Sequence, residues 1–159
     1  RLWLDRAFTV RGVGTVVTGT LAAGTVAVGD RLDLGGREVA VRGLQALGSA
    51  VERVTATARV ALNLRGVDVR ELHRGDALLT PGAFRRTALV DVTLAGAVGD
   101  DLPARPVLHV GSATVGARVR PLGGAAVRLR LDAPLPLRVG DRVLLRDPGA
   151  RRVVGADVR

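Results

Sequence analysis

The sequence predicts an all-β protein made of two tandem antiparallel β-barrels. Short segments rich in valine, leucine and threonine recur along the whole chain, and glycine-containing turns separate them. Several segments alternate apolar and polar side chains, as Arg128-Leu129-Arg130-Leu131 does, which is typical of a strand with one buried face. Regularly spaced short strands with glycine turns favour a barrel or a sandwich.

Strand-like segments follow one another with one interruption, a helical turn expected over Val67–His73. The strands expected before it are Phe8–Arg11, Thr15–Leu21, Arg31–Leu34, Glu38–Gln45 and Ala56–Leu64. The strands expected after it are Ala88–Leu94, Pro106–Val110, Ala113–Arg120, Ala126–Leu131 and Arg142–Leu145.

One short turn pattern occurs in both halves of the chain. It has the form x-Gly-Asp-x-apolar and appears at Val28–Leu32, Arg74–Leu78 and Val139–Val143. Glycine supplies a positive φ and aspartate caps the turn, so each copy is expected to lead into a strand. The repetition suggests that a similar small barrel is built twice.

The break between the two barrels is expected at Thr80-Pro81-Gly82-Ala83, because proline and glycine together end the preceding strand. We place a linker at about residues 81–87. The expected domains are residues 1–82 and residues 83–159.

The composition allows a real core but gives it an aliphatic character. Of the 159 residues, 47% are hydrophobic and only 2% are aromatic. All 24 basic residues are arginine, and the net charge is +9. Such an excess attracts polyanions, nucleic acid first among them, but arginine encoded by a GC-rich genome and exposed to solvent would give the same count. Charge alone leaves both interpretations open.

The ends and the apolar segments suggest where the chain belongs. It does not begin with methionine, and its ends are abrupt, so we expect a segment of a longer protein. No apolar stretch approaches the roughly 18 residues of a membrane span, and no signal peptide opens the chain. We expect a cytoplasmic protein without a membrane partner.

Little in the sequence indicates catalysis. Cysteine is absent, and the two histidines, His73 and His109, have no third ligand in view for a metal. Neither Ser49 nor Ser112 lies in a nucleophile-elbow pattern. A phosphate-binding G-x-x-x-x-G-K-[ST] loop is impossible without lysine. We therefore expect no enzyme activity, no nucleotide-hydrolysis site, no metal and no cofactor in these residues.

The run from Asp5 to Thr20, which contains Phe8-Thr9-Val10-Arg11-Gly12-Val13-Gly14-Thr15-Val16-Val17-Thr18-Gly19, strongly resembles the opening of domain 2 in translational GTPases such as elongation factor Tu. Leu62–Gly66 and Arg74–Leu78 follow in that family's order and spacing. In the second half, Leu108–Ala113 and Leu144–Asp147 resemble the selenocysteine-specific elongation factors more than elongation factor Tu. The resemblance implies barrels of the elongation factor Tu domain 2 and domain 3 type.

Two arginines mark the resemblance to the selenocysteine-specific factors. Elongation factor Tu has an aspartate at the position of Arg6, which helps to hold the amino group of the amino acid on the tRNA. It has an asparagine at the position of Arg59. The selenocysteine factors resemble this chain at Asp5 as well as at both arginines. The resemblance implies a pocket whose cations hold the selenolate, while Asp5 orients a guanidinium or takes the amino group. The structural alternatives are solvent exposure for Arg6 and an ion pair with Glu52 or Glu38 for Arg59.

The resemblance also implies further contacts with the tRNA. Residues expected near the 3′ end of the tRNA are Phe8, Thr18, Gln45 and Asn63, although Phe8 could equally be a core residue. Candidates for contacts with the tRNA backbone are Arg42, Arg65, Arg118, Arg120, Arg128 and Arg130, with Arg11 as a further candidate for a phosphate or domain contact. Such contacts would be independent of sequence and sensitive to salt.

Together these resemblances imply that the chain binds selenocysteinyl-tRNA as part of a factor that delivers it to the ribosome. The rest of that factor would hold a GTPase domain upstream, with GTP and magnesium, and a winged-helix region downstream that binds an RNA hairpin. Two alternatives stay open. One is the tandem barrels of another translational GTPase, and the other is a subunit of a GTP-using sulfate adenylyltransferase. Neither alternative explains why Arg6 and Arg59 occur together.

Overall fold

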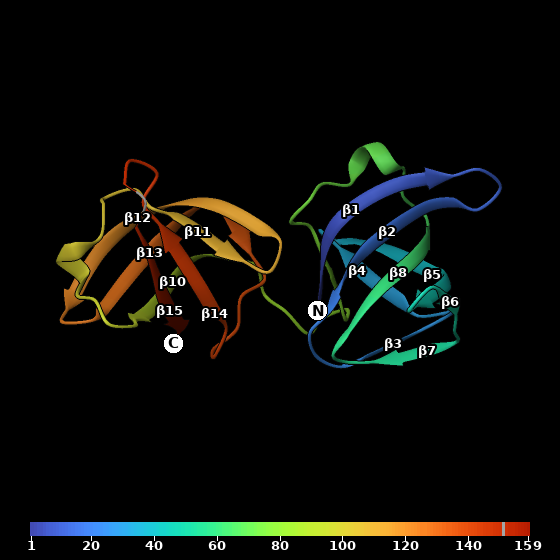
Figure 1. The fold of residues 1–159 in the computed structure, drawn as a ribbon, viewed down its shortest axis with the longest axis horizontal. Helices are drawn as coiled ribbons and strands as arrows, with labels where there is room; N and C mark the ends of the chain where they lie inside the picture. Colours follow the sequence, from blue (N-terminus) through green and yellow to red (C-terminus); the bar gives the residue numbers. More distant parts are fainter. Residues whose placement is uncertain (151) are drawn as a thin grey trace. The chain divides into compact units, whose positions relative to one another are not determined.

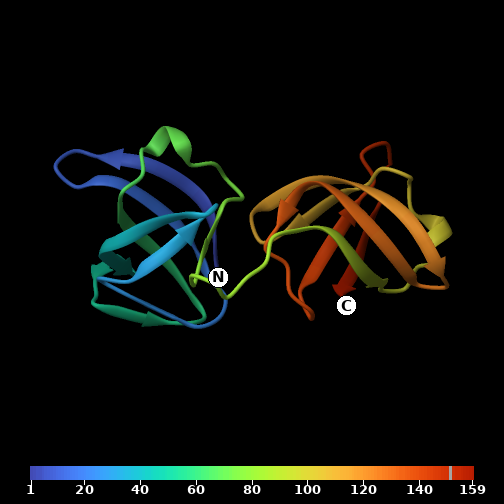
Figure 2. The same ribbon diagram turned by 180° about the vertical axis from the view of Figure 1, so that it is seen from behind.

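The computed structural model describes residues 1–150 and 152–159. The chain divides into two compact units, Arg1–Ala83 and Phe84–Arg159, and we describe each by itself. Figure 1 shows both as β-structures, and Figure 2 shows the single segment of chain that connects them. The prediction of an all-β protein with two antiparallel barrels is confirmed. No helix in the described part of the chain is long and apolar enough to cross a membrane.

The first unit is a barrel with a small additional sheet. Its strands are β1 (Leu2–Val10), β2 (Gly14–Leu21), β3 (Thr25–Ala27), β4 (Arg31–Leu34), β5 (Arg37–Ala46), β6 (Ser49–Ala50), β7 (Arg53–Thr55), β8 (Ala58–Arg65) and β9 (Ala77–Leu79). The order around the main sheet is β4-β9-β1-β2-β8-β5, and a pairing between β4 and β5 closes it. Strand β6 forms a hairpin with β5, and β3 pairs with β7 alone.

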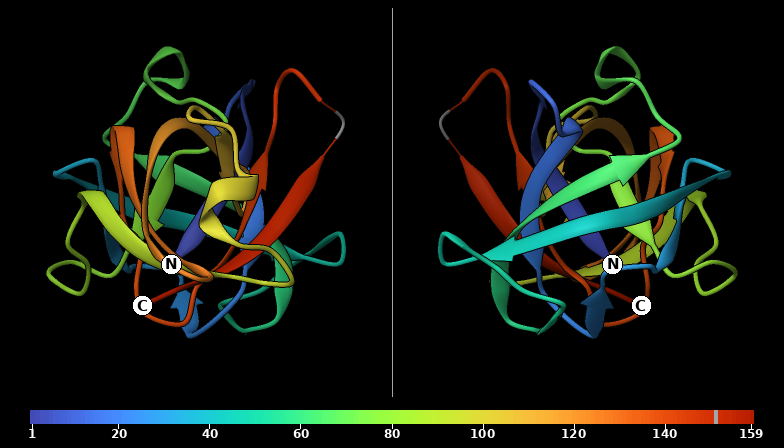
Figure 3. Two further views of the ribbon diagram at one scale, coloured as in Figure 1. Left: turned by 90° about the vertical axis from the view of Figure 1, so that its left-hand side faces the viewer. Right: turned by 90° about the vertical axis from the view of Figure 1, so that its right-hand side faces the viewer.

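The second unit is a closed barrel with strand order β10-β13-β12-β11-β14-β15. Figure 3 shows each unit from its own end, with the strands winding around it. The strands are β10 (Thr87–Leu94), β11 (Val107–Val110), β12 (Ala113–Gly123), β13 (Ala126–Leu135), β14 (Arg142–Arg146) and β15 (Val153–Val158). The described residues also include two short 3₁₀ turns, η1 (Val69–Glu71) in the first unit and η2 (Gly99–Asp101) in the second.

Each barrel has its own aliphatic core, as the composition predicted. Leu4, Val17 and Leu62 are almost completely buried in the first unit, and Leu108 and Leu129 in the second. The alternation along each strand explains this arrangement, because every second side chain points into the barrel. The side chains between them face outward.

The three Gly-Asp turns share one geometry, and their structural interpretation is confirmed. The glycines have positive φ angles of 92° at Gly29, 96° at Gly75 and 86° at Gly140. Each following aspartate accepts a hydrogen bond from a backbone N–H three residues earlier. These bonds are Ala27 N–Asp30 at 2.9 Å, His73 N–Asp76 at 2.7 Å and Arg138 N–Asp141 at 3.0 Å. Strands β4, β9 and β14 begin immediately afterwards.

The predicted strands all exist, but the sequence analysis missed several others. It began β1 at Phe8, whereas the strand begins at Leu2. It placed no strand at β3, β6, β7, β9 or β15. Most of the missed strands are only two or three residues long, too short for an alternating pattern. The helical turn expected over 67–73 is η1, with a capping box between Asp68 and Glu71.

A β-bulge in β1 determines which side chains of this strand face outward. Leu4 pairs with Gly19 of β2, while Arg6 pairs with Thr18, so Asp5 is the extra residue. Leu4 and Ala7 pack into the core, and Arg6 and Phe8 are exposed. Without the extra residue, the alternation would turn Arg6 inward and Ala7 outward.

We expect Gly19→Ala to destabilise the first unit by about 2–3 kcal/mol, because overpacking of a filled site forces the backbone to move. A Cβ atom at Gly19 would lie 2.3 Å from the Trp3 carbonyl oxygen and 2.6 Å from a Leu2 methyl carbon. Urea unfolding followed by the fluorescence of Trp3, the single tryptophan, measures the change.

Gly43→Ala is the matched control, because a Cβ atom there would make only an ordinary contact of 3.6 Å with Cβ of Asn63. We expect its unfolding free energy to stay within about 0.5 kcal/mol of the wild-type value. Equal losses in the two variants would contradict the close approach of β1 and β2 at Gly19.

Candidate functional site

The outward face of strands β1, β2, β8 and β5 brings together the residues predicted for the selenocysteine pocket and for the tRNA 3′ end. Two neighbouring rows cross this face. One row contains Arg6, Thr18, Ala61 and Gln45, and the next contains Phe8, Val16, Asn63 and Gly43. Arg59 follows on β8 beside Thr20, on the other side of the first row. Residues far apart in the sequence are therefore neighbours on one surface.

Asp5 joins the three strands at one end of this face. Its Oδ2 accepts a hydrogen bond from Nη1 of Arg59 at 2.6 Å, and its Oδ1 accepts one from Nη2 at 3.2 Å. The hydroxyl of Thr18 donates to Oδ1 at 2.5 Å. The carboxylate therefore holds the Arg59 guanidinium through both oxygens, which fixes the direction of the charge. We call Asp5, Arg6, Thr18 and Arg59 the charged cluster.

The other members of the charged cluster lower the pKa of Asp5. Partial burial alone would raise it, but the hydrogen bonds from Thr18 and Arg59 and the positive charges of Arg59 and Arg6 outweigh burial. Asp5 is therefore ionised at neutral pH. With two guanidinium groups and one carboxylate, the cluster carries a net single positive charge.

The two arginines differ in their surroundings. The Arg59 side chain is 61% exposed although it is paired, whereas Asp5 is only 17% exposed, so the guanidinium remains accessible above its partner. The alternative ion pair of Arg59 with Glu52 or Glu38 is wrong, since Arg59 pairs with Asp5, and Glu38 pairs with Arg31. Arg6 is exposed and acts on Asp5 through its charge, but among the described residues its side chain forms no hydrogen bond or ion pair.

A pocket of about 360 Å³ adjoins the charged cluster. Phe8, Gln45 and Asn63, all predicted to lie near the tRNA 3′ end, line it. Phe8 is 41% exposed, so it is not a core residue, and its outward position follows from the bulge. The hairpin between β1 and β2, which extends beyond the rest of the sheet in Figure 1, supplies Val10 and Val13. Thr18, by contrast, belongs to the charged cluster.

The sequence analysis did not single out the apolar residues of this pocket, among them Val16, Ala50 and Ala61. An indirect signal exists in the alternation, because Val16 and Ala61 lie two residues from Thr18 and Asn63 on the same faces of their strands. Their contribution depends on the pairing of β2 with β8, which the sequence alone does not specify.

Four of the arginines predicted to contact the tRNA backbone form a cluster on the second unit. Arg118 lies directly opposite Arg130 across β12 and β13, and Arg120 lies opposite Arg128. Like charges directly opposite each other destabilise a sheet, so this arrangement favours an anionic ligand. We call these four residues the arginine quartet. The remaining candidates, Arg11, Arg42 and Arg65, are exposed on the first unit.

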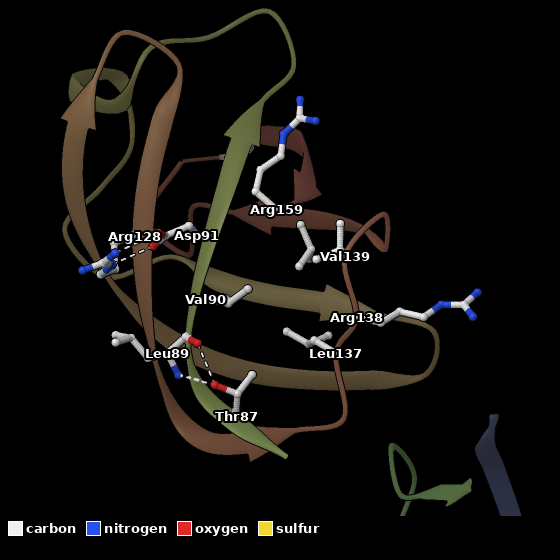
Figure 4. Close-up of a pocket in the computed structure, with 10 residues that line it drawn as sticks. Thr87, Leu89, Val90, Asp91, Arg128, Leu137, Arg138, Val139 and Arg159 are labelled. Atoms are coloured by element: carbon white, nitrogen blue, oxygen red, sulfur yellow. Dashed lines mark hydrogen bonds and ion pairs between the residues drawn. The ribbon is translucent and has the colours of Figure 1, made fainter. Parts of the chain in front are cut away.

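One member of the arginine quartet is already paired. Figure 4 shows Arg128 beside Asp91, where its Nε and Nη2 donate to the two carboxylate oxygens at 2.7 and 2.8 Å. This bidentate pair lowers the pKa of Asp91 and raises that of Arg128. Among the described residues, no ion pair or side-chain hydrogen bond involves Arg118, Arg120 or Arg130. A phosphate would therefore meet three unpaired guanidinium groups.

The pocket in Figure 4, of about 320 Å³, lies beside the arginine quartet. Leu89, Leu137 and Val139 form its apolar lining, and Arg138 points away from it in this view. In the part of the chain that the structure describes, no group of three or more His, Cys, Asp or Glu side chains could hold a metal ion.

Comparisons with known protein families match a region in each of the two units. A family model described as elongation factor Tu domain 2 matches residues 14–79. A second, described as the β-barrel domain of selenocysteine-specific elongation factor, matches residues 103–158. Both matched regions are barrel domains of translational GTPases.

Curated relatives include both selenocysteine-specific elongation factors and an elongation factor Tu. The chain is 38% identical over 160 residues to the selenocysteine-specific elongation factor of Escherichia coli, and the match covers 97% of this chain and 26% of the relative. It is 36% identical to that of Desulfomicrobium baculatum, over 92% of this chain and 25% of the relative. An elongation factor Tu of Streptomyces avermitilis is 33% identical, over 96% of this chain and 43% of the relative. The chain spans about a quarter of the length of the first two.

Solved structures show the same fold. A bacterial selenocysteine-specific elongation factor, EF-Sec, superposes with a TM-score of 0.90 at 27% sequence identity, over 99% of this chain and 27% of that one. The apo form of SelB from Methanococcus maripaludis superposes with a TM-score of 0.80 at 25% identity, over 99% of this chain and 40% of that one.

We expect Asp5→Asn to destabilise the first unit by about 1–2 kcal/mol at neutral pH, because it removes charge-assisted hydrogen bonds to a partly exposed partner. The pKa of Asp5 is lowered in the folded state, so the ionised carboxylate contributes to the free energy of unfolding above the ordinary carboxyl pKa. This contribution is lost as the pH falls through the lowered pKa. Urea unfolding followed by Trp3 fluorescence at about pH 7 and about pH 3 should show the difference between wild type and variant shrinking in acid. A difference that does not depend on pH would contradict the ion pair.

Proposed function

We propose that this chain, whose two barrels match elongation factor Tu domain 2 and the β-barrel domain of selenocysteine-specific elongation factor, binds the aminoacyl end and acceptor arm of selenocysteinyl-tRNA. The charged cluster is the observation that carries the proposal. It places a fixed and a free guanidinium on one outward face, beside a pocket of uncharged residues.

Charge provides the selectivity of the proposed site. A selenol is more acidic than a thiol, so selenocysteine is largely an anion at neutral pH, whereas serine on the same tRNA is neutral. Arg6 and Arg59 would stabilise the selenolate. Serine would leave the same cations desolvated without a counter-charge, which costs free energy. Discrimination by charge exceeds what one methylene group could provide through shape.

Asp5 would position the Arg59 guanidinium. Both of its oxygens are occupied by Thr18 and Arg59, which supports the orientation of the Arg59 guanidinium over capture of the amino group. The Arg6 side chain has no hydrogen-bonded partner among the described residues, so it would be able to turn toward the ligand. One cation would therefore be preorganised and the other would close on the selenolate.

The geometry of β8 fits the length of an aminoacylated tRNA end. Asn63 in the pocket and Arg59 in the charged cluster are four residues apart on one face, which corresponds to about 13 Å along a strand. The ribose and ester that join the terminal base to the amino acid would span this distance. The base would then lie in the pocket while the selenolate lies at the charged cluster.

The arginine quartet would bind the acceptor arm. Its guanidinium groups face outward from β12 and β13 and are suited to successive phosphates rather than to bases. We propose that the whole protein is a cytoplasmic factor that delivers the tRNA to the ribosome. GTP and magnesium would bind to a GTPase domain upstream, and a winged-helix region downstream would bind an RNA hairpin. Without a lysine, these residues cannot form the phosphate-binding loop, so we assign them no step of GTP hydrolysis.

The proposal predicts that Arg59→Ala reduces the preference of the full-length, GTP-bound protein for selenocysteinyl-tRNA over seryl-tRNA by about tenfold or more, because one cation of the charged cluster is lost. Equilibrium binding to the two tRNAs under reducing conditions gives the ratio. Arg65→Ala is the matched control, since it removes the same charge from the end of the same strand, outside the charged cluster. It should weaken both complexes equally and preserve the ratio. Equal affinity of the wild-type protein for the two tRNAs would refute the selenocysteine assignment.

A second experiment tests the arginine quartet. We expect Arg118→Ala combined with Arg130→Ala to weaken binding of all tRNAs by a similar factor and to reduce the slope of log affinity against log salt by about 2. The double variant should also stabilise the second unit slightly, because the two guanidinium groups repel each other across the sheet. An unchanged salt slope would show that these residues do not contact phosphate.

A further inference from the structure

Two carboxylates border the arginine quartet. The first, Asp91, lies opposite Arg128 across β10 and β13, and its two oxygens accept both hydrogen bonds from that guanidinium. Leu89, the preceding outward residue of β10, lies opposite Arg130 and is 54% exposed. Strand β10 contains no basic residue. A phosphate backbone that continued from β13 onto β10 would therefore meet a carboxylate or an apolar side chain.

The second carboxylate, Asp132, lies at one end of the quartet, two residues beyond Arg130 on β13. It is seated over Gly116 of β12, where a Cβ atom would lie 2.3 Å from Oδ2 of Asp132. Gly116 has no positive φ angle, so the carboxylate occupies its side-chain space without a backbone reason for glycine. Asp132 is exposed, and in the described part of the chain its side chain forms no ion pair or hydrogen bond. An unpaired negative charge therefore lies on the sheet beside the quartet.

The basic surface continues in a different direction, over the segment 104–106. Two backbone N–H groups of β12 donate to carbonyl oxygens of this segment at 2.9 and 3.1 Å, so Arg105 lies beside Arg118. Arg105 is exposed, and no ion pair or side-chain hydrogen bond involves it among the described residues. Neighbouring strands are about 4.8 Å apart, so three cations follow one another closely across three adjacent segments. We call Arg105, Arg118 and Arg130 the unpaired row.

We infer that Asp91 and Asp132 confine a bound phosphate backbone to the unpaired row and exclude polyanions that cannot follow it. This inference rests on the proposed function. Like charges repel each other strongly within a Debye length, about 8 Å at physiological salt. A straight, stiff polyanion lying along β12 and β13 would place phosphates over Asp132. The backbone of an acceptor arm that crosses the strands along the unpaired row would avoid both carboxylates.

A purely structural role explains only one of the two carboxylates. Asp91 neutralises Arg128, which would otherwise face Arg120 across the sheet without a counter-charge. Asp132 has no such partner, and an asparagine would fill the same space over Gly116 without repelling an anion. A carboxylate at this position lowers the affinity of the quartet for any anion that approaches it. We therefore assign Asp132 to the choice between polyanions, since repulsion of the wrong ligand contributes to specificity as much as attraction of the right one.

The test compares Asp132→Asn with the wild-type protein, both full-length and GTP-bound. The probes are selenocysteinyl-tRNA and a random-sequence DNA duplex of about 20 base pairs, which is straight because its persistence length is about 150 base pairs. We expect the variant to bind the duplex about threefold more tightly or better at about 50 mM salt, and this gain should shrink as the salt concentration rises. Its affinity for the tRNA should change by less than about twofold.

Asp157→Asn is the matched control, because it removes the same charge from β15, which lies opposite β12 in the closed barrel. It should leave the affinity for the duplex unchanged. The gain of Asp132→Asn should also disappear when it is combined with Arg118→Ala and Arg130→Ala, because the duplex then has no row of cations to bind.

Asp91→Asn tests the other border of the quartet. It releases Arg128 from its bidentate pair, so the slope of log affinity for the duplex against log salt should steepen by about 1. An unchanged slope would contradict the role of Asp91.

The inference is overturned if Asp132→Asn and the wild-type protein bind the duplex equally, or if neither binds it. An equal gain for duplex and tRNA, the same gain in Asp157→Asn, or a gain that persists without Arg118 and Arg130 would also overturn it. If the wild-type protein still prefers selenocysteinyl-tRNA to seryl-tRNA in these cases, only this inference fails. If that preference is missing, the proposed function fails independently.

Discussion

The extra residue in β1 is the constraint on which the proposed site depends. A closed barrel requires Leu4 and Ala7 to face the core, and a regular strand cannot place both there with two residues between them. The bulge solves this conflict and leaves Asp5 and Arg6 consecutively outside the core. Asp5 then reaches both Thr18 on β2 and Arg59 on β8. The same residue therefore fixes the local register and the orientation of the proposed ligand-binding cation.

Along the same strands, the inward side chains stabilise the barrel and the outward side chains form the proposed site. The inward side chains of β8, Val60, Leu62 and Leu64, are nearly completely buried. The alternate residues of the same strand face outward, and of these Arg59 lies in the charged cluster and Asn63 in the pocket. A substitution on the outward face changes the core little, so a barrel of this type can acquire a new ligand preference through a few outward residues.

The sequence was sufficient for the fold class because alternation and Gly-Asp turns depend on neighbours in the chain. The sequence was insufficient to predict the short strands that complete the barrels. Strand β9, only Ala77–Leu79, forms because β1 and β4 lie on either side of it, and no local pattern identifies it. The alternative partners of Arg59, Glu52 and Glu38, were wrong for a similar reason, whereas the expected pairing of Asp5 with a guanidinium is present. Asp5 is 54 residues away, and only the pairing of β1, β2 and β8 brings the two together. Family resemblance identified Asn63 as a candidate, but the unpaired state of its amide could not be predicted without the pocket.

Two features of the ligand-free chain that disfavour folding have a common explanation. The arginine quartet places like charges opposite each other on the second unit, and Asn63 buries an unpaired acceptor on the first. Leucine at position 63 or a neutral residue in the quartet would remove either cost. Both features lie on outward faces, where they do not weaken the barrel cores, and each would be satisfied by a different part of one RNA ligand. In the proposed complex, a phosphate backbone would supply the charge that the quartet lacks, and a base would supply the donor that Asn63 lacks. The unfavourable contacts of the free protein thus become the favourable contacts of the proposed complex.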